Sequence, residues 1–147
     1  MRRASRFSSV SVSHHVFLVE NHALMRAALS TLIGFEPDLE LCGMAGSAED
    51  AIDQEVWAGC DLLLTDVSLP GVDGLELAAR ARRERPDLPV VVVSASVDPA
   101  TVRRAKEVGV RAYLSKAKLG ETLVPMLREV LSSDSPGGPG GPATLRE

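Results

Sequence analysis

Residues 60–71 read CDLLLTDVSLPG, and this stretch decides the fold. Its residues 62–64 are all apolar, a run too short for a helix but typical of a central strand buried on both faces. Pro70 and Gly71 cannot continue a strand, so the strand ends near Asp66. Open α/β sheets bind their ligands at the carboxyl ends of strands, which makes Asp66 a candidate functional residue. Taken alone, the motif is equally compatible with an aspartate that only caps the next turn.

Strand-like and helix-like segments alternate on both sides of this stretch. The other apolar runs of strand length are residues 15–20, 39–44, 90–93 and 112–114. A segment of helical character follows each strand, and these segments begin near residues 22, 47, 73, 98 and 121. Strand followed by helix, five times over, predicts an α/β domain with a doubly wound, five-stranded parallel sheet and right-handed crossovers.

The two ends of the chain differ from the middle in composition. Residues 1–14 are rich in Ser and Arg and lack apolar periodicity, which predicts a disordered leader. Ser, Gly and Pro dominate from residue 132 onward, so we expect residues 132–147 to be a flexible linker or tail. One domain of residues 15–131 remains between them.

Composition argues against several classes of function. The net charge of −4 and the low aromatic content of 3% disfavour nucleic-acid binding, which needs a basic face or stacking rings. No apolar run approaches the roughly 20 residues of a membrane span, and the N-terminal arginines are not followed by the apolar core of a secretory signal. We therefore expect a cytoplasmic protein. Cys42 and Cys60 form no CxxC pair or disulfide framework, and we expect both to be reduced core residues.

Polar side chains stand at the ends of four of the five predicted strands. They are Glu20 and Asn21 after the first strand, then Asp66, Ser94 and Lys116 at the ends of the third, fourth and fifth. If the strand order is 2-1-3-4-5, these four strands are neighbours, and the side chains converge on one cleft. The alternative is an unrelated scatter of polar strand ends, but the chemical complementarity of these groups favours a shared site.

In order and spacing, these segments resemble the receiver domain of bacterial two-component response regulators. The matching motifs are VFLVENH, LLLTDVSLPGVDGLEL, VVVSAS and AYLSK, and the resemblance runs from about residue 16 to residue 131. The first and third motifs, with His22 after the acidic pair, are most similar to the LuxR/NarL-type subfamily, which carries a helix-turn-helix output domain. The resemblance implies a flavodoxin-like fold with the strand order 2-1-3-4-5.

The resemblance also implies a metal-assisted phosphoacceptor. Asp66 would take a phosphoryl group from the phosphohistidine of a histidine kinase. Glu20 and Asn21 would hold Mg²⁺ together with Asp66 and the backbone carbonyl of Ser68. Such a ligand set suits Mg²⁺, a hard ion that binds a few oxygen ligands and the phosphoryl group while keeping waters.

Three further residues match positions of the family. Ser94 would hydrogen-bond one phosphoryl oxygen, and Lys116 would ion-pair with another as a compact point charge. Tyr113 would be the aromatic residue whose ring turns inward when the hydroxyl moves. The alternatives are a snorkelling surface lysine for Lys116 and a plain half-buried strand residue for Tyr113.

Asn21 departs from the family, which usually has a second carboxylate at this position. An amide oxygen can ligate a metal but brings no charge. Losing one charge near 4 Å weakens the attraction for a cation by about 1–4 kcal/mol, depending on the effective dielectric. We expect weaker Mg²⁺ binding and slower phosphorylation than in typical receivers, unless the longer side chain of Glu20 compensates.

The expected function is a signalling switch and not a turnover enzyme on external substrates. Its partners would be a histidine kinase and, on activation, a second copy of the chain, through the fourth helix and fifth strand or the first and fifth helices. DNA would be bound only through an output domain absent from this chain. Residues 144–147, TLRE, resemble the T-x-R-E that opens such a domain, although four residues match easily by chance.

Other functions of the same fold are weaker hypotheses. A phosphorylation-independent pseudo-receiver is supported only by Asn21. An aspartate-based phosphatase usually needs a second acid two residues on, where this chain has Ser68. A nucleotide switch needs a G-x-x-x-x-G-K-[ST] motif, which is absent from the sequence, and a flavin site needs a phosphate-binding loop where this chain has Glu20, Asn21 and His22.

Overall fold

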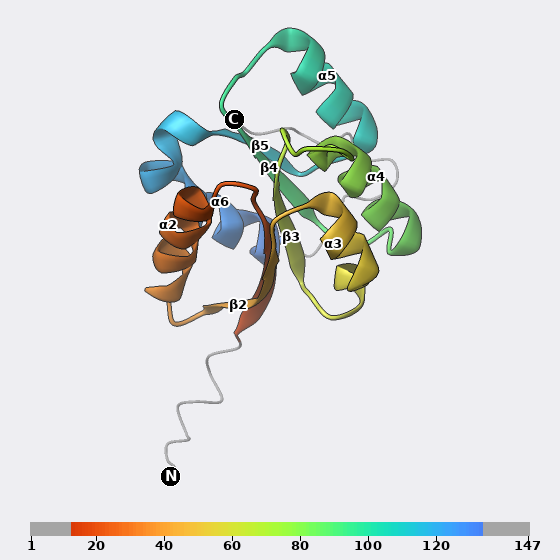
Figure 1. Ribbon diagram of the computed structural model, residues 1–147. Coiled ribbons are helices and arrows are strands. Elements are labelled where there is room, and N and C mark those ends of the chain that lie inside the picture. The colour runs from red at the N-terminus through yellow and green to blue at the C-terminus, as the bar shows by residue number, and fades with distance from the viewer. Residues whose placement is uncertain (1–12, 134–147) are drawn as a thin grey trace.

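The computed structural model describes residues 13–133, so most of the predicted leader and tail, including the TLRE motif, lies outside the described residues. A single sheet of parallel strands forms the middle layer (Figure 1). Its strands are β1 (His14–Val19), β2 (Leu39–Ala45), β3 (Leu62–Asp66), β4 (Val90–Ser94) and β5 (Ala112–Ser115). They lie in the order β2-β1-β3-β4-β5, and all pairings are parallel. The predicted α/β class and strand order are confirmed.

Helices cover both faces of the sheet (Figure 1). One face is covered by α2 (Ala23–Gly34) and α6 (Leu119–Ser132), and the other by α3 (Ala48–Asp53), α4 (Gly74–Glu84) and α5 (Pro99–Val108). Two short 3-10 turns, η1 (Val56–Ala58) and η2 (Lys116–Lys118), complete the described elements. In the described part of the chain, no helix is long and apolar enough to cross a membrane.

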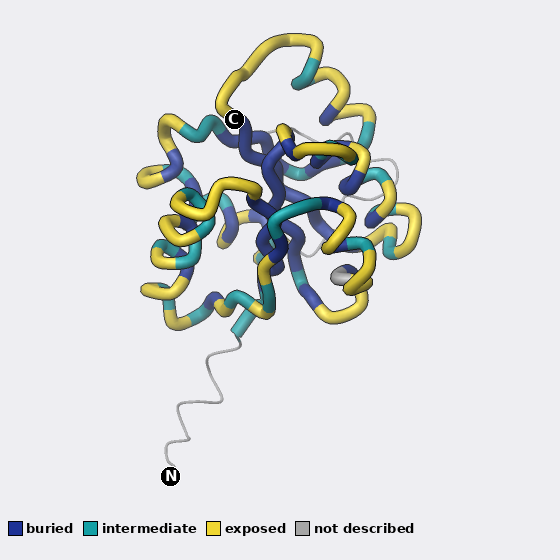
Figure 2. The backbone as a smooth tube through the Cα atoms, in the orientation of Figure 1, coloured by how far each residue is buried: buried dark blue, intermediate teal, exposed yellow. Residues whose placement is uncertain are grey.

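The deciding stretch lies at the centre of the core. All five residues of β3 and all five of β4 are buried, and the buried strands form the dark interior of Figure 2. Successive side chains along a strand point to opposite faces. Leu63 therefore packs in the cluster beneath α3, α4 and α5, whereas Leu62 and Leu64 pack in the cluster beneath α2 and α6. The continuous apolar run follows from burial on both faces.

Side-chain caps fix where the helices begin. Ser47 accepts the backbone N–H of Asp50 at the start of α3, and Asp98 accepts that of Thr101 at the start of α5. Asp73 begins α4 with a reciprocal capping box to Glu76. These predicted helix starts are confirmed, while α6 begins at Leu119 rather than at the predicted residue 121.

The prediction that both cysteines lie in the core is right for Cys60 and wrong for Cys42. Cys60 is buried, and burial raises the pKa of its thiol to about 11. Cys42 is exposed because β2 has a bulge there: Val16 pairs with Leu41, and the next residue of β1 pairs with Gly43. A bulge leaves one residue out of the pairing and makes an edge strand a poorer template for aggregation.

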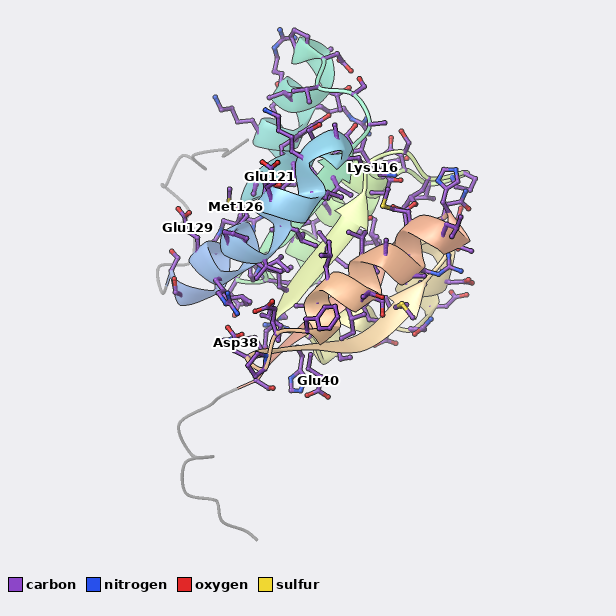
Figure 3. The ribbon with its side chains drawn as sticks, turned by 90° about the vertical axis from the view of Figure 1, so that its left-hand side faces the viewer. Asp38, Glu40, Lys116, Glu121, Met126 and Glu129 are labelled. Atoms are coloured by element: carbon purple, nitrogen blue, oxygen red, sulfur yellow. The ribbon has the colours of Figure 1, made fainter. Side chains whose placement is uncertain are left out.

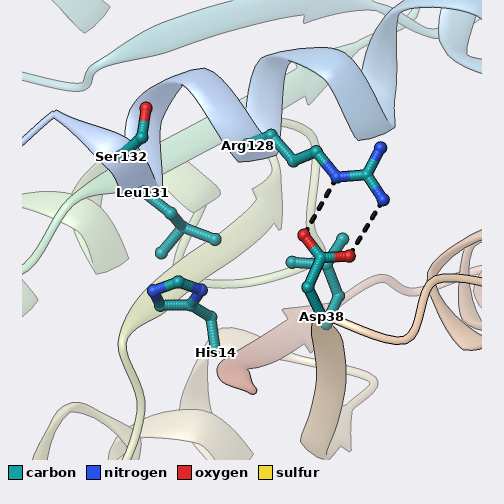
Figure 4. A pocket seen from close by; sticks show the side chains of 6 residues that line it. His14, Asp38, Arg128, Leu131 and Ser132 are labelled. Atoms are coloured by element: carbon teal, nitrogen blue, oxygen red, sulfur yellow. Dashed lines mark hydrogen bonds and ion pairs between the residues drawn. The ribbon is translucent and has the colours of Figure 1, made fainter. Parts of the chain in front are cut away.

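Ion pairs connect α6 to the segment before β2 at the amino ends of the strands. Arg128 on α6 donates two hydrogen bonds of 2.9 Å to the carboxylate of Asp38 and also contacts Glu36, both of which precede β2. The hydrogen bond from Arg128 lowers the pKa of Asp38. Beside this pair is a pocket of about 250 Å³, shown in Figure 4. It is lined by His14, Asp38, Leu39, Arg128, Leu131 and Ser132.

Candidate functional site

The carboxyl edge of the sheet lies at the opposite end from Asp38; Figure 3 shows Lys116 at this end and Asp38 at the other. Asp66 is the last residue of β3 and pairs in register with Val93, so Ser94 lies one position further along the neighbouring strand. Ser94 pairs with Ser115, the residue before Lys116. The strand order therefore brings Asp66, Ser94 and Lys116 to the ends of three adjacent strands.

Lys116 joins two buried carboxylates at this edge. Its Nζ lies 2.7 Å from Oδ2 of Asp66 and 3.3 Å from Oε1 of Glu20. The side chains are 14% exposed for Lys116, 2% for Asp66 and 0% for Glu20. Lys116 is therefore not a snorkelling surface residue, and its ammonium group is the counter-charge of both acids.

Burial and charge shift the pKa values of the pair. Burial raises the pKa of Asp66 and the charge of Glu20 adds to this rise, while the hydrogen bond from Lys116 opposes it without cancelling it. Burial alone would lower the pKa of Lys116, but its hydrogen bond with Asp66 and the two carboxylate charges outweigh burial, and the pKa is raised. Lys116 thus stays protonated, and the ionised form of Asp66 depends on it.

Glu20 has one oxygen without a matched donor. Its Oε2 accepts the backbone N–H of His22 at 3.0 Å. Its Oε1 is buried and, among the described residues, has no donor aligned for a hydrogen bond, since the contact with Lys116 is an ion pair only. An unmatched buried carboxylate oxygen beside a second carboxylate is the kind of atom that a hard cation binds. The oxygens of Glu20 and Asp66 therefore fit Mg²⁺.

The donor set for a cation is nevertheless small. Residues 13–133 contain no group of three or more His, Cys, Asp or Glu side chains that would hold a metal ion. Asn21 is exposed beside Glu20, and the backbone N–H of Ser68 donates to Oδ1 of Asp66 at 3.2 Å, which places the Ser68 backbone next to that carboxylate. A cation here would thus depend on amide, backbone and water oxygens in addition to the two acids.

Ser94 and Tyr113 meet at Ser96. The hydroxyl of Ser94 accepts the backbone N–H of Ser96 at 3.1 Å, and the hydroxyl of Tyr113 donates to the backbone carbonyl of the same residue at 2.9 Å. Tyr113 is fully buried, so it is not a half-buried strand residue, and its ring occupies an inward position. Within residues 13–133, no hydrogen bond joins Ser94 to Asp66.

Residues 16–128 match the family model described as the response regulator receiver domain. The chain belongs to this family. A curated relative, the transcriptional regulatory protein UhpA of Salmonella typhimurium, is 30% identical over 115 residues, which are 78% of this chain and 57% of UhpA. A protein-glutamate methylesterase/protein-glutamine glutaminase of Dechloromonas aromatica is 36% identical over 109 residues, covering 73% of this chain but only 31% of that enzyme.

A solved structure supports the fold of this receiver domain independently. The signal receiver domain of the putative response regulator NarL from Mycobacterium tuberculosis superimposes with a TM-score of 0.77 at 23% identity, over 83% of this chain and 98% of that one. The predicted membership of the response regulator receiver family is confirmed by the family match and by UhpA, and the solved structure supports the fold. The chain spans little more than half the length of UhpA.

Sequence reasoning missed Arg26, which hydrogen-bonds to the backbone just after β1 in this receiver domain. Its Nη1 donates to the backbone carbonyl of Glu20 at 2.6 Å and lies 3.4 Å from that of Asn21. Arg26 is the single charged residue of α2, whose sequence is ALMRAALSTLIG. That isolated charge, one turn after the acidic pair, was the available signal.

Proposed function

We propose that this receiver domain is a phosphoacceptor switch in which Asp66 takes a phosphoryl group from a histidine kinase. The bond between phosphorus and the kinase imidazole nitrogen breaks, and a bond forms between phosphorus and a carboxylate oxygen of Asp66. The observation that carries the proposal is the position of Lys116, whose ammonium lies within 2.7 Å of Asp66 and 3.3 Å of Glu20. Phosphoryl transfer needs positioning and charge stabilisation more than covalent assistance.

The chain's own residues divide the remaining tasks. Lys116 exchanges part of its contact with Asp66 for a phosphoryl oxygen, and Ser94 turns its hydroxyl from Ser96 to donate to another. Glu20, Asp66, the amide of Asn21 and the backbone carbonyl of Ser68 would hold Mg²⁺. When bound, the ion supplies positive charge to the phosphoryl oxygens.

The switch would pass through the β4–α5 connection. Ser94 and Tyr113 both bond to Ser96, so a rotation of the Ser94 hydroxyl releases one of these contacts on the segment. Val97 is exposed beside it. The changed surface near α5 and β5, or that of α2 and α6, would then favour a homodimer, and an output domain outside this chain would control transcription.

A phosphorylation-independent pseudo-receiver is the second candidate. Two observations favour it: Asn21 is exposed, and residues 13–133 bring two carboxylates, Glu20 and Asp66, to the site. Acetyl phosphate separates the two functions. The wild-type chain and Asp66→Asn are incubated with it in Mg²⁺ and in EDTA, and intact masses are recorded. The phosphoacceptor proposal requires an adduct in the wild type with Mg²⁺ and its loss in the variant; no adduct under any condition leaves the pseudo-receiver.

A further inference from the structure

Glu49 reaches from α3 to the loop that follows Asp66. Its Oε2 accepts the backbone N–H of Val72 at 3.1 Å, between residues 23 apart in sequence. The same carboxylate packs on Gly71, which has a φ of 77°, and a Cβ at that position would collide with Oε2. The hydrogen bond from Val72 lowers the pKa of Glu49, so the ionised carboxylate is the form that the loop binds at neutral pH.

The loop has few other anchors. In the described part of the chain, the bond to Glu49 is the one hydrogen bond that residues 68–72 make with an element other than β3 and α4. Leu69 is buried in the core and Val72 packs against it, but Ser68, Pro70 and Gly71 are exposed. Because the exposed residues of the loop have one external hydrogen bond, we expect the loop to become more mobile when that bond is removed.

The position of this loop matters for the site. Ser68 donates its backbone N–H to Asp66 and, under the proposed function, offers its carbonyl to the metal. Beyond Val72, Asp73 caps α4 and is bound by Arg104 of α5 at 2.9 Å. The α4 end of the loop is thus held twice, by Glu49 at Val72 and by Arg104 at Asp73, whereas the Ser68 end is held by its bond to Asp66 and by the buried Leu69.

We propose that Glu49 is a positioning residue that holds residues 68–72 over Asp66 and so pre-orders the backbone of Ser68 for metal binding. This inference rests on the proposed function. Among the described residues, no hydrogen bond or ion pair joins Glu49 to Asp66, so Glu49 would act through the loop. A loop that is already ordered loses less conformational entropy when it binds a ligand. The contact of Glu49 with the loop, called the Glu49 clamp below, therefore increases the affinity for the metal without touching the ion.

The test uses three variants of the 147-residue chain, each with a single substitution. Glu49→Ala removes the acceptor, Glu49→Gln keeps a carbonyl oxygen in its place, and Asp50→Ala is the matched control. Asp50 lies in the same first turn of α3 and carries the same charge, but its carboxylate has no hydrogen bond or ion pair among the described residues. Amide exchange of Val72 is measured by NMR, and the Mg²⁺ dissociation constant by titration.

Glu49→Ala is expected to speed exchange of the Val72 amide about tenfold and to weaken Mg²⁺ binding about threefold, the effect of one hydrogen bond. Glu49→Gln should recover most of both, and Asp50→Ala should behave as the wild type. Unchanged exchange in Glu49→Ala overturns the clamp, and so does faster exchange with unaltered Mg²⁺ affinity. If Asp50→Ala speeds exchange and weakens Mg²⁺ binding as much as Glu49→Ala does, the cause is the lost charge, and the clamp is overturned as well. A wild type that binds no Mg²⁺ refutes the proposed function, while the exchange data still judge the contact itself.

Discussion

Replacing Lys116 with methionine tests the buried charge cluster most sharply. Removing one partner of a buried ion pair costs about 3–5 kcal/mol, because an uncompensated charge stays behind. Lys116 is 14% exposed, so water can partly replace its charge, and we expect a loss of about 3 kcal/mol in the free energy of unfolding at pH 7.

The loss should depend on pH. Burial already raises the pKa of Asp66 above its ordinary value of 3.8, and Lys116 is the main group that limits the rise. Without Lys116 the pKa of Asp66 rises further, so the folded variant binds a proton more readily than the unfolded chain does. An acid with a raised pKa in the folded state destabilises the fold as the pH rises, and protonation removes that penalty. The difference in the free energy of unfolding between the wild type and Lys116→Met should therefore become smaller as the pH is lowered from 7 to 5.

Urea unfolding at both pH values provides the assay. The single tryptophan, Trp57, is buried in the core and reports the transition by fluorescence. Lys118→Met is the matched control, because Lys118 is exposed in the same 3-10 turn and has no ion pair among the described residues. A deficit in Lys116→Met that equals that of the control, or that is the same at both pH values, would refute the reasoning.

Three further substitutions address the metal site, the switch and the loop. Asn21→Asp should tighten Mg²⁺ binding by about 1–4 kcal/mol in a titration, since it restores one charge near 4 Å; unchanged affinity would show that Asn21 is not near the ion. Tyr113→Phe removes the hydrogen bond to Ser96 and should cost about 1 kcal/mol in urea unfolding while weakening phosphorylation-dependent association. An association unaffected by the change would exclude a role of the Tyr113 hydroxyl in the switch. Gly74→Ala places a Cβ against the backbone carbonyl of Asp66, so it should lower the free energy of unfolding by about 1–3 kcal/mol and slow labelling by acetyl phosphate. The control Ala79→Gly, in the same helix, should be labelled at the wild-type rate. Normal labelling of Gly74→Ala would show that the loop tolerates the displacement caused by the Cβ.

The fold was predictable because its signals are local. A strand buried on both faces needs an apolar run, as in residues 62–64, and a helix start needs a capping side chain, as at Ser47, Asp73 and Asp98. The strand order was predicted from the resemblance to receivers. In the structure, this order brings Asp66 and Lys116 together at one edge of the sheet. The roles of these residues in phosphoryl transfer stay predictions.

The features that were missed depend on contacts between distant segments. Glu49 with Val72 and Arg128 with Asp38 join residues far apart in sequence, and an exposed charge has too many possible partners for its neighbour to be predicted. Cys42 was misplaced because an apolar strand hides a bulge. The neighbouring Gly43 was the available signal, because a glycine inside a strand often marks a bulge.

Beryllofluoride binding measured by fluorine NMR tests the central claim most directly, because this anion has the shape and charge of a phosphoryl group on a carboxylate. The wild-type chain should show bound fluorine resonances only when Mg²⁺ is present, and Asp66→Asn should show none. Bound resonances that persist in Asp66→Asn, or their absence from the wild type at saturating Mg²⁺, would contradict a metal-dependent phosphoacceptor at Asp66.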